Sequence, residues 1–259
     1  MSGKNSPTNN QPGGRREALR QQQAAAARSA KRTGTVVKAA WATGLAVIAV
    51  MLAVIVWSFV RPGSAGVAAG ALVAPASASE AGAVVIGDRN AKVTVSIYAD
   101  FMCPYCGQFE RANGTDLTAA VESGKAKLEI HPMAFLDPQS SGTKYSTRAA
   151  NAFVTVANAD PALAWKFDRL LYANQPAEGS SGLTDAQLVD YAKQAGVPDS
   201  VTATFSEQTY VPWVQKVTDQ AFASGITGTP TVKINGQVFN GDLYSVGPLT
   251  AAIDQAASA

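Results

Sequence analysis

Hydrophobic and polar residues follow three different patterns along this chain. Residues 39–60 form one apolar run without a charged side chain, whereas the 38 residues before it are polar. After residue 82, short β-branched runs typical of strands alternate with segments in which apolar residues recur every three or four positions, as in helices. These patterns predict one long apolar segment followed by a domain that contains both strands and helices.

The predicted elements of residues 83–259 occur in the order strand, helix, strand, helical block, hairpin and helix. The predicted strands are 83–86, 93–100, 126–133, 231–234 and 237–239. The predicted helices are 103–112, 115–123, 147–157, 161–172, 184–195, 198–224 (broken by Pro212) and 248–257. Thr184 fits a helix N-cap, Gly225 fits a helix stop, and Asn235-Gly236 predicts a two-residue hairpin turn.

The apolar run is long enough to cross a membrane. At about 1.5 Å per residue, a helix over 39–60 spans roughly 33 Å, and Trp41 and Trp57 lie near its ends, where interfacial aromatics occur. Residues 1–38 hold eight basic side chains and one acidic, whereas 13 basic and 18 acidic side chains follow residue 60. The positive-inside rule therefore predicts a basic cytoplasmic tail at 1–38, a transmembrane helix at 39–60 and an extracytoplasmic remainder.

Two other interpretations fit the N-terminal part less well. A cleaved signal peptide usually has a core of about 7–15 apolar residues, which is shorter than this run, but 74–76 and 76–78 fit an A-x-A cleavage pattern and leave cleavage open. A nucleic-acid-binding tail is disfavoured because no aromatic residue precedes Trp41; contact with anionic lipid fits the basic charge better. Residues 61–82, rich in Ala, Gly, Ser and Pro, predict a flexible linker.

The two cysteines of the chain stand in the segment Cys103-Pro104-Tyr105-Cys106, between a predicted strand and a predicted helix. This setting is typical of a redox pair. Unpaired N–H groups and the dipole at a helix N-terminus stabilise a thiolate, which is the reactive form of cysteine. Pro104 suits the first helical position because it has no N–H to leave unpaired. We expect Cys103 to be the exposed nucleophile and Cys106 the more buried resolving thiol.

Three other roles for the cysteines fit the sequence less well. A disulfide that closes a four-residue ring adds little to stability, because it constrains the unfolded chain only slightly. Zinc usually takes four ligands, and besides two cysteines the chain has one histidine, His131, so no metal site is predicted. Inert core thiols do not account for the proline and tyrosine between them.

The segment from Asp100 to Cys106, the distant Gly228-Thr229-Pro230 before a strand, and the helical block between them resemble the DsbA-like family of thiol–disulfide oxidoreductases, in its membrane-anchored actinobacterial form. The resemblance implies an α/β thioredoxin fold over 83–259, with an all-helical insertion at about 140–225, preceded by one N-terminal transmembrane helix. Pro230 matches the family's cis-proline. Thr229 is then implied to border the Cys103 sulfur and to pair with an extended peptide, the alternative being an ordinary Thr-Pro turn.

The chain departs from the family pattern at two positions. Tyr105 stands where oxidising members often carry histidine, which suggests a milder oxidant because a neutral side chain stabilises a thiolate less than a cation does. Ile97 stands six residues before Cys103, where the family carries a buried carboxylate. Asp100 is the nearest acid, and two roles fit it: proton transfer through water, or capping of the loop.

The resemblance implies an extracytoplasmic enzyme of the cell membrane that introduces disulfides into exported proteins. A membrane redox partner would reoxidise the pair, with no metal, organic cofactor or nucleic acid involved. Two alternatives remain: a reductase or isomerase of the same fold, and a non-enzymatic, peptide-binding chaperone. A lone histidine such as His131 is expected on the surface or in packing, and Asn113-Gly114-Thr115 matches a glycosylation acceptor that has no use in a bacterial protein.

Overall fold

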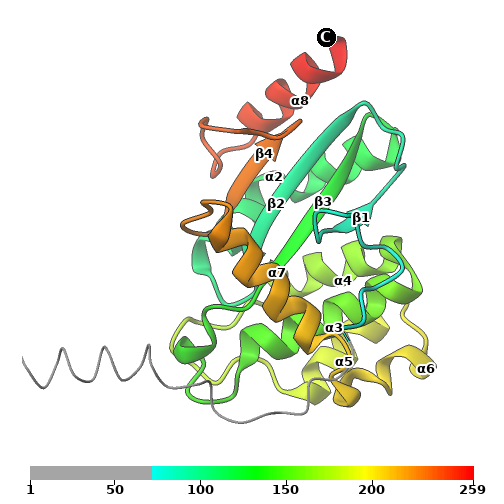
Figure 1. The fold of residues 1–259 in the computed structure, drawn as a ribbon, viewed down its shortest axis with the longest axis vertical. Coiled ribbons are helices and arrows are strands. Elements are labelled where there is room, and N and C mark those ends of the chain that lie inside the picture. The colour runs from blue at the N-terminus through cyan, green and yellow to red at the C-terminus, as the bar shows by residue number, and fades with distance from the viewer. Residues whose placement is uncertain (1–71) are drawn as a thin grey trace, which may run out of the picture. The chain divides into compact units, whose positions relative to one another are not determined.

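Five strands form one sheet in the order β1-β3-β2-β4-β5 in the computed structural model, which describes residues 72–259 (Figure 1). The strands are β1 (Val84–Ile86), β2 (Val93–Asp100), β3 (Ala126–Met133), β4 (Thr231–Ile234) and β5 (Gln237–Val238). Strand β2 runs parallel to β3, whereas the β1–β3, β2–β4 and β4–β5 pairs are antiparallel. This is the thioredoxin-type α/β architecture predicted from the sequence.

Seven helices and two short 3-10 turns accompany the sheet in the described residues. They are α2 (Pro104–Glu122), η1 (Asp137–Gln139), α3 (Tyr145–Ala159), α4 (Pro161–Ala173), α5 (Asp185–Gln194), α6 (Asp199–Thr202), η2 (Phe205–Glu207), α7 (Val211–Ala223) and α8 (Pro248–Ser258). Figure 1 shows α7 across one face of the sheet, α2 on the other, and α3 to α6 gathered at one end. The block from α3 to α7 is the predicted helical insertion.

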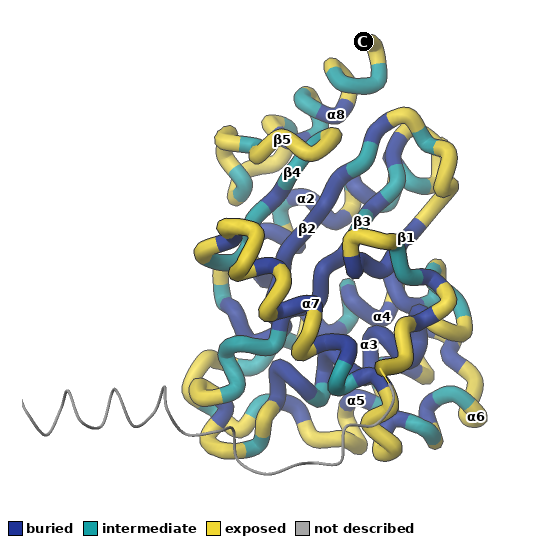
Figure 2. Tube along the Cα trace, viewed as in Figure 1, coloured by how far each residue is buried: buried dark blue, intermediate teal, exposed yellow. Residues whose placement is uncertain are grey.

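The central strands are buried on both faces, as Figure 2 shows for β2 and β3. Parallel strands need a long crossover, which α2 supplies, and covered parallel strands have nearly continuous apolar sequences. On one face, Val95, Ile97 and Leu128 join the main core. On the other face, Tyr98 and Met133 form a second cluster with Ala221 and Ile226 at the end of α7 and just beyond it. Packing on both faces therefore fixes the position of β2, and with it the point at which the chain enters α2.

Helix α2 is continuous over 19 residues, although the sequence predicted two segments separated near Asn113-Gly114. The amide of Asn113 donates to the carbonyl oxygens of Phe109 and Leu243, so the side chain is paired inside the fold. Tertiary contacts therefore override the local preference of an Asn-Gly pair for a turn. Asn113 is buried, so the match to a glycosylation acceptor lies inside a helix.

Several local signals in the sequence occur in the structure as predicted. Thr184 caps α5 in a capping box with Gln187. Asn235 and Gly236 both have positive φ, as a type I′ hairpin turn requires. The stretch predicted as one helix broken at Pro212 is instead divided into α6, η2 and α7, with Pro212 in the first turn of α7.

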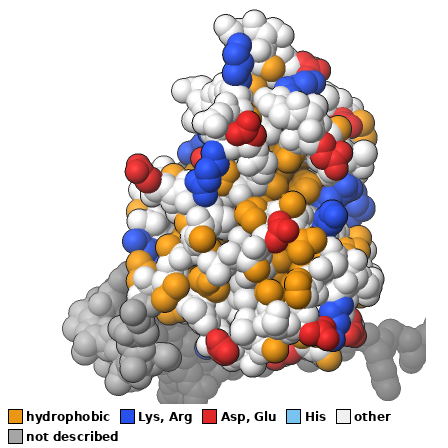
Figure 3. All heavy atoms as spheres, turned by 90° about the vertical axis from the view of Figure 1, so that its right-hand side faces the viewer, with side chains coloured by type: hydrophobic (Ala, Val, Ile, Leu, Met, Phe, Trp, Pro, Cys, Tyr) orange, Lys and Arg blue, Asp and Glu red, His pale blue; other side chains and the backbone are white. Residues whose placement is uncertain are grey.

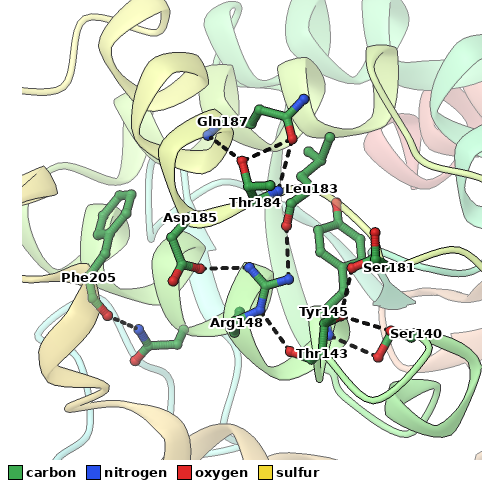
Figure 4. A network of polar contacts seen from close by, with 11 residues as sticks. Ser140, Thr143, Tyr145, Arg148, Ser181, Leu183, Thr184, Asp185, Gln187 and Phe205 are labelled. Carbon is green, nitrogen blue, oxygen red and sulfur yellow. Dashed lines mark hydrogen bonds and ion pairs between the residues drawn. The ribbon is translucent and has the colours of Figure 1, made fainter.

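Arg148 on α3 joins two parts of the helical insertion (Figure 4). Its guanidinium donates to the carbonyl oxygens of Thr143 and Leu183 and forms an ion pair with Asp185 at 2.6 Å. The same side chain thereby holds the beginning of α3 against the beginning of α5. Because the backbone carbonyls are fixed as well as the carboxylate, the contact contributes more than an isolated surface ion pair.

Residues 75–82 differ from the prediction of a flexible linker over 61–82. Pro75, Ser77 and Gly82 are buried, and Ala78 forms a β-bridge with Val84. The N–H of Ala76 also donates to the side chain of Asn158 at 2.9 Å. The physical reason is that β1 is an edge strand, whose free backbone groups this segment partly covers.

The tail predicted at 1–38, the transmembrane helix predicted at 39–60 and linker residues 61–71 lie outside the described residues. Between residues 72 and 259, no helix has the length and apolar character needed to cross a membrane. On the face drawn in Figure 3, hydrophobic side chains gather towards the middle, and basic and acidic side chains lie mostly around them.

Candidate active site

Cys103 lies at the N-cap of α2, and Pro104 is the first residue of the helix. The backbone of Cys103 is extended, with φ −70° and ψ 116°. Its N–H donates to the carbonyl oxygen of Asp100, and its own carbonyl accepts from the N–H of Cys106, both at 3.0 Å. The cysteine pair therefore occupies the first turn of α2, where the unpaired N–H groups of the helix are found.

The loop before β4 meets Cys103 from the opposite side of the site. The Thr229–Pro230 peptide bond is cis, and the Cys103 thiol donates to the carbonyl oxygen of Thr229 at 3.4 Å. The hydroxyl of Thr229 is buried and has no hydrogen-bond partner among the described residues. The structure therefore brings together Cys103, Cys106, Thr229 and Pro230, as the resemblance implied.

Cys103 is less accessible than expected from the sequence. Both cysteines are free thiols, and the residues are 5% (Cys103) and 1% (Cys106) exposed. The expectation of an exposed nucleophile was wrong in degree, because Cys103 lies within the main hydrophobic core cluster and contacts the Thr229 carbonyl. The expected order still holds, since Cys106 is the more deeply buried thiol.

The two thiols have opposite acidities. Hydrogen bonds, chiefly from the Cys106 side chain and also from the backbone of Cys106 and Tyr105, lower the pKa of Cys103 to about 6, against burial, which raises it. Burial raises the pKa of Cys106 well above its ordinary value, and the neighbouring Cys103 raises it further. Near neutral pH, Cys103 is therefore the thiolate and Cys106 the thiol.

Asp100 is 0% exposed and holds together three segments around the cysteines. One carboxylate oxygen accepts from the Met102 N–H and the Ser146 hydroxyl, and the other accepts from the N–H groups of Phe135 and Leu136. Burial raises the pKa of Asp100 to about 6, although hydrogen bonds from Ser146, Met102 and Leu136 act in the opposite direction. With four donors on its two oxygens, Asp100 has the geometry of a loop cap.

Gln175, just after α4, is a contact of the site that sequence reasoning missed. Its amide nitrogen donates to the carbonyl oxygens of Cys103 at 2.8 Å and Phe101 at 3.0 Å. Gln175 thereby ties the helical insertion to the backbone of the redox loop. Nothing in the local sequence marks this glutamine, because its role comes from tertiary packing alone.

Two exposed tyrosines lie at the outer edge of the site. Tyr105, between the cysteines, is exposed, and its ring centroid lies 6.0 Å from that of Tyr244 in the segment between β5 and α8. The charges of Cys106 and Cys103 add to burial in raising the pKa of Tyr244, so this ring lies within electrostatic reach of the pair. The tyrosines offer an aromatic surface to a polypeptide that approaches Cys103.

His131 is a packing residue. It is buried, and its ring stacks on Tyr98 with centroids 4.0 Å apart. Burial lowers the pKa of His131 to about 4, and the charge of Lys233 adds to this effect, so the ring is neutral at physiological pH. In residues 72–259, no group of three or more His, Cys, Asp and Glu side chains is arranged to hold a metal ion.

Comparison with known proteins agrees with this geometry. A family model described as thioredoxin matches residues 79–255. The crystal structure of oxidised DsbA from Mycobacterium tuberculosis is similar with a TM-score of 0.60 and 30% identity, over 68% of this chain and 93% of that one. The chain belongs to the DsbA-like thiol–disulfide oxidoreductase family. Its cysteine pair and cis-proline loop thus stand in a fold shared with DsbA.

Two curated relatives extend the comparison. Disulfide bond formation protein D of Bacillus subtilis is 28% identical over 159 residues, which is 61% of this chain and 69% of that protein. The serine/threonine-protein kinase PknE of M. tuberculosis is 37% identical over 117 residues, or 44% of this chain. The chain spans only 21% of the kinase's length, so the similarity concerns one part of that protein.

Proposed function

We propose that this chain is an extracytoplasmic protein-disulfide oxidoreductase that introduces disulfides into exported proteins through Cys103 and Cys106. The observation that carries the proposal is the position of Cys103, at the N-cap of α2 and 3.4 Å from the Thr229 carbonyl oxygen. A thiol that is acidic, partly shielded and next to a peptide-binding loop is suited to thiol–disulfide exchange.

The exchange begins with the Cys103–Cys106 disulfide. A substrate thiolate attacks the Cys103 sulfur, the bond to Cys106 breaks, and Cys106 leaves with the electron pair and takes up a proton. A second substrate thiolate then attacks the substrate sulfur of the mixed disulfide and displaces Cys103 as a thiolate. The product is an oxidised substrate and a reduced enzyme pair.

The low pKa of Cys103 favours the oxidising direction. A thiol of lower pKa leaves faster, and a stabilised thiolate makes the reduced form of the pair more stable. The pKa of Cys103 is lowered to about 6 with the side chain of Cys106 as the largest cause. Release of Cys103 from the mixed disulfide is therefore easier than release of an ordinary substrate thiol.

Thr229 and Pro230 would hold the substrate during this exchange. Strand β4 begins at Thr231, so an extended peptide beside Thr229 would pair with the backbone at the start of the strand. Such pairing uses main-chain groups and accepts many sequences. Pro104 starts the helix that stabilises the thiolate, Asp100 fixes the loop, and Tyr105 would contact apolar parts of the substrate.

The proposed setting is the outer face of a cell membrane, with 39–60 as a single transmembrane helix and 1–38 in the cytoplasm. The charge difference between the two sides of the apolar run supports this orientation. A membrane redox partner would reoxidise the cysteine pair, as the DsbA-like family membership suggests. The exchange itself uses sulfur chemistry alone and calls for no metal or organic cofactor.

Oxidative refolding of a reduced substrate protein tests the proposal. The oxidised full chain should restore substrate activity, the Cys103→Ser variant should not, and the Cys106→Ser variant should accumulate a mixed disulfide when its Cys103 meets a substrate disulfide. Full activity of Cys103→Ser would contradict the proposal and favour a peptide-binding chaperone. A reduction potential low enough for efficient insulin reduction would instead favour the reductase or isomerase alternative.

A further inference from the structure

A small cavity lies beside Cys106 on the inner side of α2. Its volume is about 10 Å³, which is close to the smallest volume that holds one water molecule. Apolar residues from β2, β3, α2 and α4 form most of its wall: Ile97, Ala99, Phe109, Ile130 and Trp165. Four side chains that can carry a proton complete it, namely Cys106, Glu110, Asp168 and Tyr172.

Glu110 and Asp168 are buried, with exposures of 6% and 4%. Glu110 follows Cys106 by four positions on α2, and its carboxyl oxygen extends along the helix to Gly114, where it accepts from Arg169. Asp168 comes from α4 and lines the same cavity. Two buried acidic residues from two helices therefore line the same cavity as the more shielded thiol.

The charges around the pair do not balance if both carboxyl groups are ionised. Arg169 donates to Glu110 at 3.0 Å and also reaches the hydroxyl groups of Thr118 and Thr115. One cation thus faces two acids in a buried site. Since an uncompensated buried charge is costly, one proton remains on the pair near neutral pH.

We propose that Glu110 and Asp168 are a proton-exchanging pair for Cys106, giving a proton to its sulfur when the disulfide opens and taking it back when the disulfide closes. This proposal rests on the proposed function of Cys103 and Cys106. The cavity borders Cys106, Glu110 and Asp168 and has room for one water molecule, through which a proton would pass between the pair and the sulfur. Such a pair is needed because Cys106, a residue that is only 1% exposed, cannot exchange protons freely with bulk water.

The electrostatics of the neighbouring groups agree with this arrangement. Burial raises the pKa of Glu110 to about 7, against the lowering effect of Arg169. Burial also raises the pKa of Asp168 well above its ordinary value, and the charge of Glu110 raises it further. Glu110 therefore gains or loses its proton near neutral pH, and Asp168 holds its proton more tightly than an ordinary carboxyl group does.

The other titratable groups that face Cys106 are less suited to this task. Asp100, at the end of β2, already accepts four hydrogen bonds on its carboxylate. Burial raises the pKa of Tyr172 on α4 well above its ordinary value, and the charge of Cys106 raises it further, so it keeps its proton. Cys103 is the reacting partner, and the guanidinium of Arg169 is engaged with Glu110, Thr118 and Thr115.

The proton follows the sulfur electrons in both directions. When a substrate thiolate opens the disulfide, the Cys106 sulfur receives the electron pair of the broken bond and then a proton from the carboxyl pair. When the pair closes, the Cys106 thiol returns that proton, and its thiolate attacks the Cys103 sulfur of a mixed disulfide and displaces the attached thiolate. No electron acceptor other than the disulfide is involved.

The aromatic disulfide 5,5′-dithiobis(2-nitrobenzoate) separates the two cysteines in one experiment. Attack by Cys103 on this reagent releases a first coloured thiolate, and closure by Cys106 on the mixed disulfide releases a second. Stopped-flow absorbance of the reduced full-length protein then measures both phases. The test variants are Asp168→Asn and Glu110→Gln, and Glu122→Gln on the exposed end of α2 is the matched control.

The expected result is a slower second phase with an unchanged first phase. General acid–base assistance contributes about 10²-fold or more, so either variant should slow closure at least about tenfold near neutral pH. The second-phase rate of wild type and control should level off above about pH 7, where Glu110 has lost its proton. In the variants it should continue to rise with pH, because hydroxide must then remove the Cys106 proton.

An unchanged second phase, or one slowed by the same factor at every pH, would overturn the proposal, since a purely structural role would not alter the pH profile. A wild-type protein without a first phase would overturn the proposed function and this inference with it. If Glu110→Gln does not fold because Arg169 loses its partner, Asp168→Asn decides, since it keeps the Glu110–Arg169 ion pair.

Discussion

The sulfur of Cys103 lies 3.4 Å from the carbonyl oxygen of Thr229, although 126 positions separate the two residues. The register of the sheet explains this contact. Strands β2 and β4 are antiparallel neighbours, with Tyr98 opposite Thr231. The residues that follow β2 and those that precede β4 therefore meet at the same end of the sheet, and the two halves of the site come together without either loop being long.

The reduced protein should become more stable between about pH 6 and pH 9. The pKa of Cys103 is lowered to about 6 in the folded state, so ionisation favours folding. This contribution is complete above the pKa of an unfolded cysteine, about 8.5, and is lost as the pH falls through about 6. Urea unfolding of the reduced protein at several pH values measures it. Cys103→Ala should lack this increase, and an equal increase in wild type and variant would contradict the prediction.

Replacing Asp100 by Asn should destabilise the protein by about 1–3 kcal/mol, because an amide NH₂ group would face donors that now bond to a carboxylate oxygen. The pKa of Asp100 is raised to about 6, so its protonation favours the folded state. That contribution is complete below about pH 4 and is lost as the pH rises through about 6.

Urea unfolding between pH 4 and pH 7 measures both effects of Asp100→Asn. The variant should be less stable and should lack the Asp100 part of the decline in wild-type stability over this range. Asp219→Asn, at an exposed position of α7, is the matched control and should behave as wild type. A variant as stable as wild type would show that the four hydrogen bonds to Asp100 do not hold the loop.

The effects of changing Gln175 and Gly107 should not be additive. A Cβ atom at position 107 would clash with the side-chain oxygen of Gln175, so Gly107→Ala should displace the glutamine and break its bonds to the loop. Each single variant should lose about 1–3 kcal/mol of unfolding free energy. In the double variant the clash is absent, so its loss should be smaller than the sum.

A double-mutant cycle by urea unfolding checks this coupling. Gln194→Ala, at an exposed position on α5, controls for the loss of a glutamine side chain and should cost little. Additive losses for Gln175→Ala and Gly107→Ala would contradict the predicted displacement.

Residues 39–60 should hold the protein in the membrane. The full chain should remain in the membrane fraction after alkaline carbonate extraction, because an apolar helix of this length is inserted rather than adsorbed. A variant that carries residues 61–259 behind a separate cleavable export signal should be released. Release of the full chain by carbonate would contradict the proposed anchor.

The parts of the fold that depend on neighbouring residues could be predicted from the sequence. The position of Cys103 at a helix start, the Thr184 cap and the Asn235-Gly236 turn each follow from a few adjacent positions. The split expected in α2 did not follow, because the Asn113 amide is satisfied by Leu243, which lies 130 positions away. Local preference cannot include a partner that only the tertiary fold supplies.

The candidate site shows the same division. The contact of Thr229 with Cys103 was expected from family resemblance and not from any local pattern. Ser146, Gln175 and Asp168 escaped notice because their side chains act across helix interfaces, and no spacing rule links them to the cysteines. Even the burial of Cys103 depends on the later loop that approaches its sulfur.

Two glycines on α2 have a consequence for any attempt to stiffen the redox helix. Gly107 and Gly114 stand seven positions, about two turns, apart, and a Cβ atom would meet Gln175 at the first and Glu110 at the second. On this side of the helix the two glycines leave space that the polar side chains of Gln175 and Glu110 occupy. Each glycine lowers helix stability by about 1 kcal/mol relative to alanine. Alanine at either position would nevertheless displace the neighbouring side chain, Gln175 or Glu110. Greater rigidity in α2 would therefore come at the expense of the polar groups behind its cysteines.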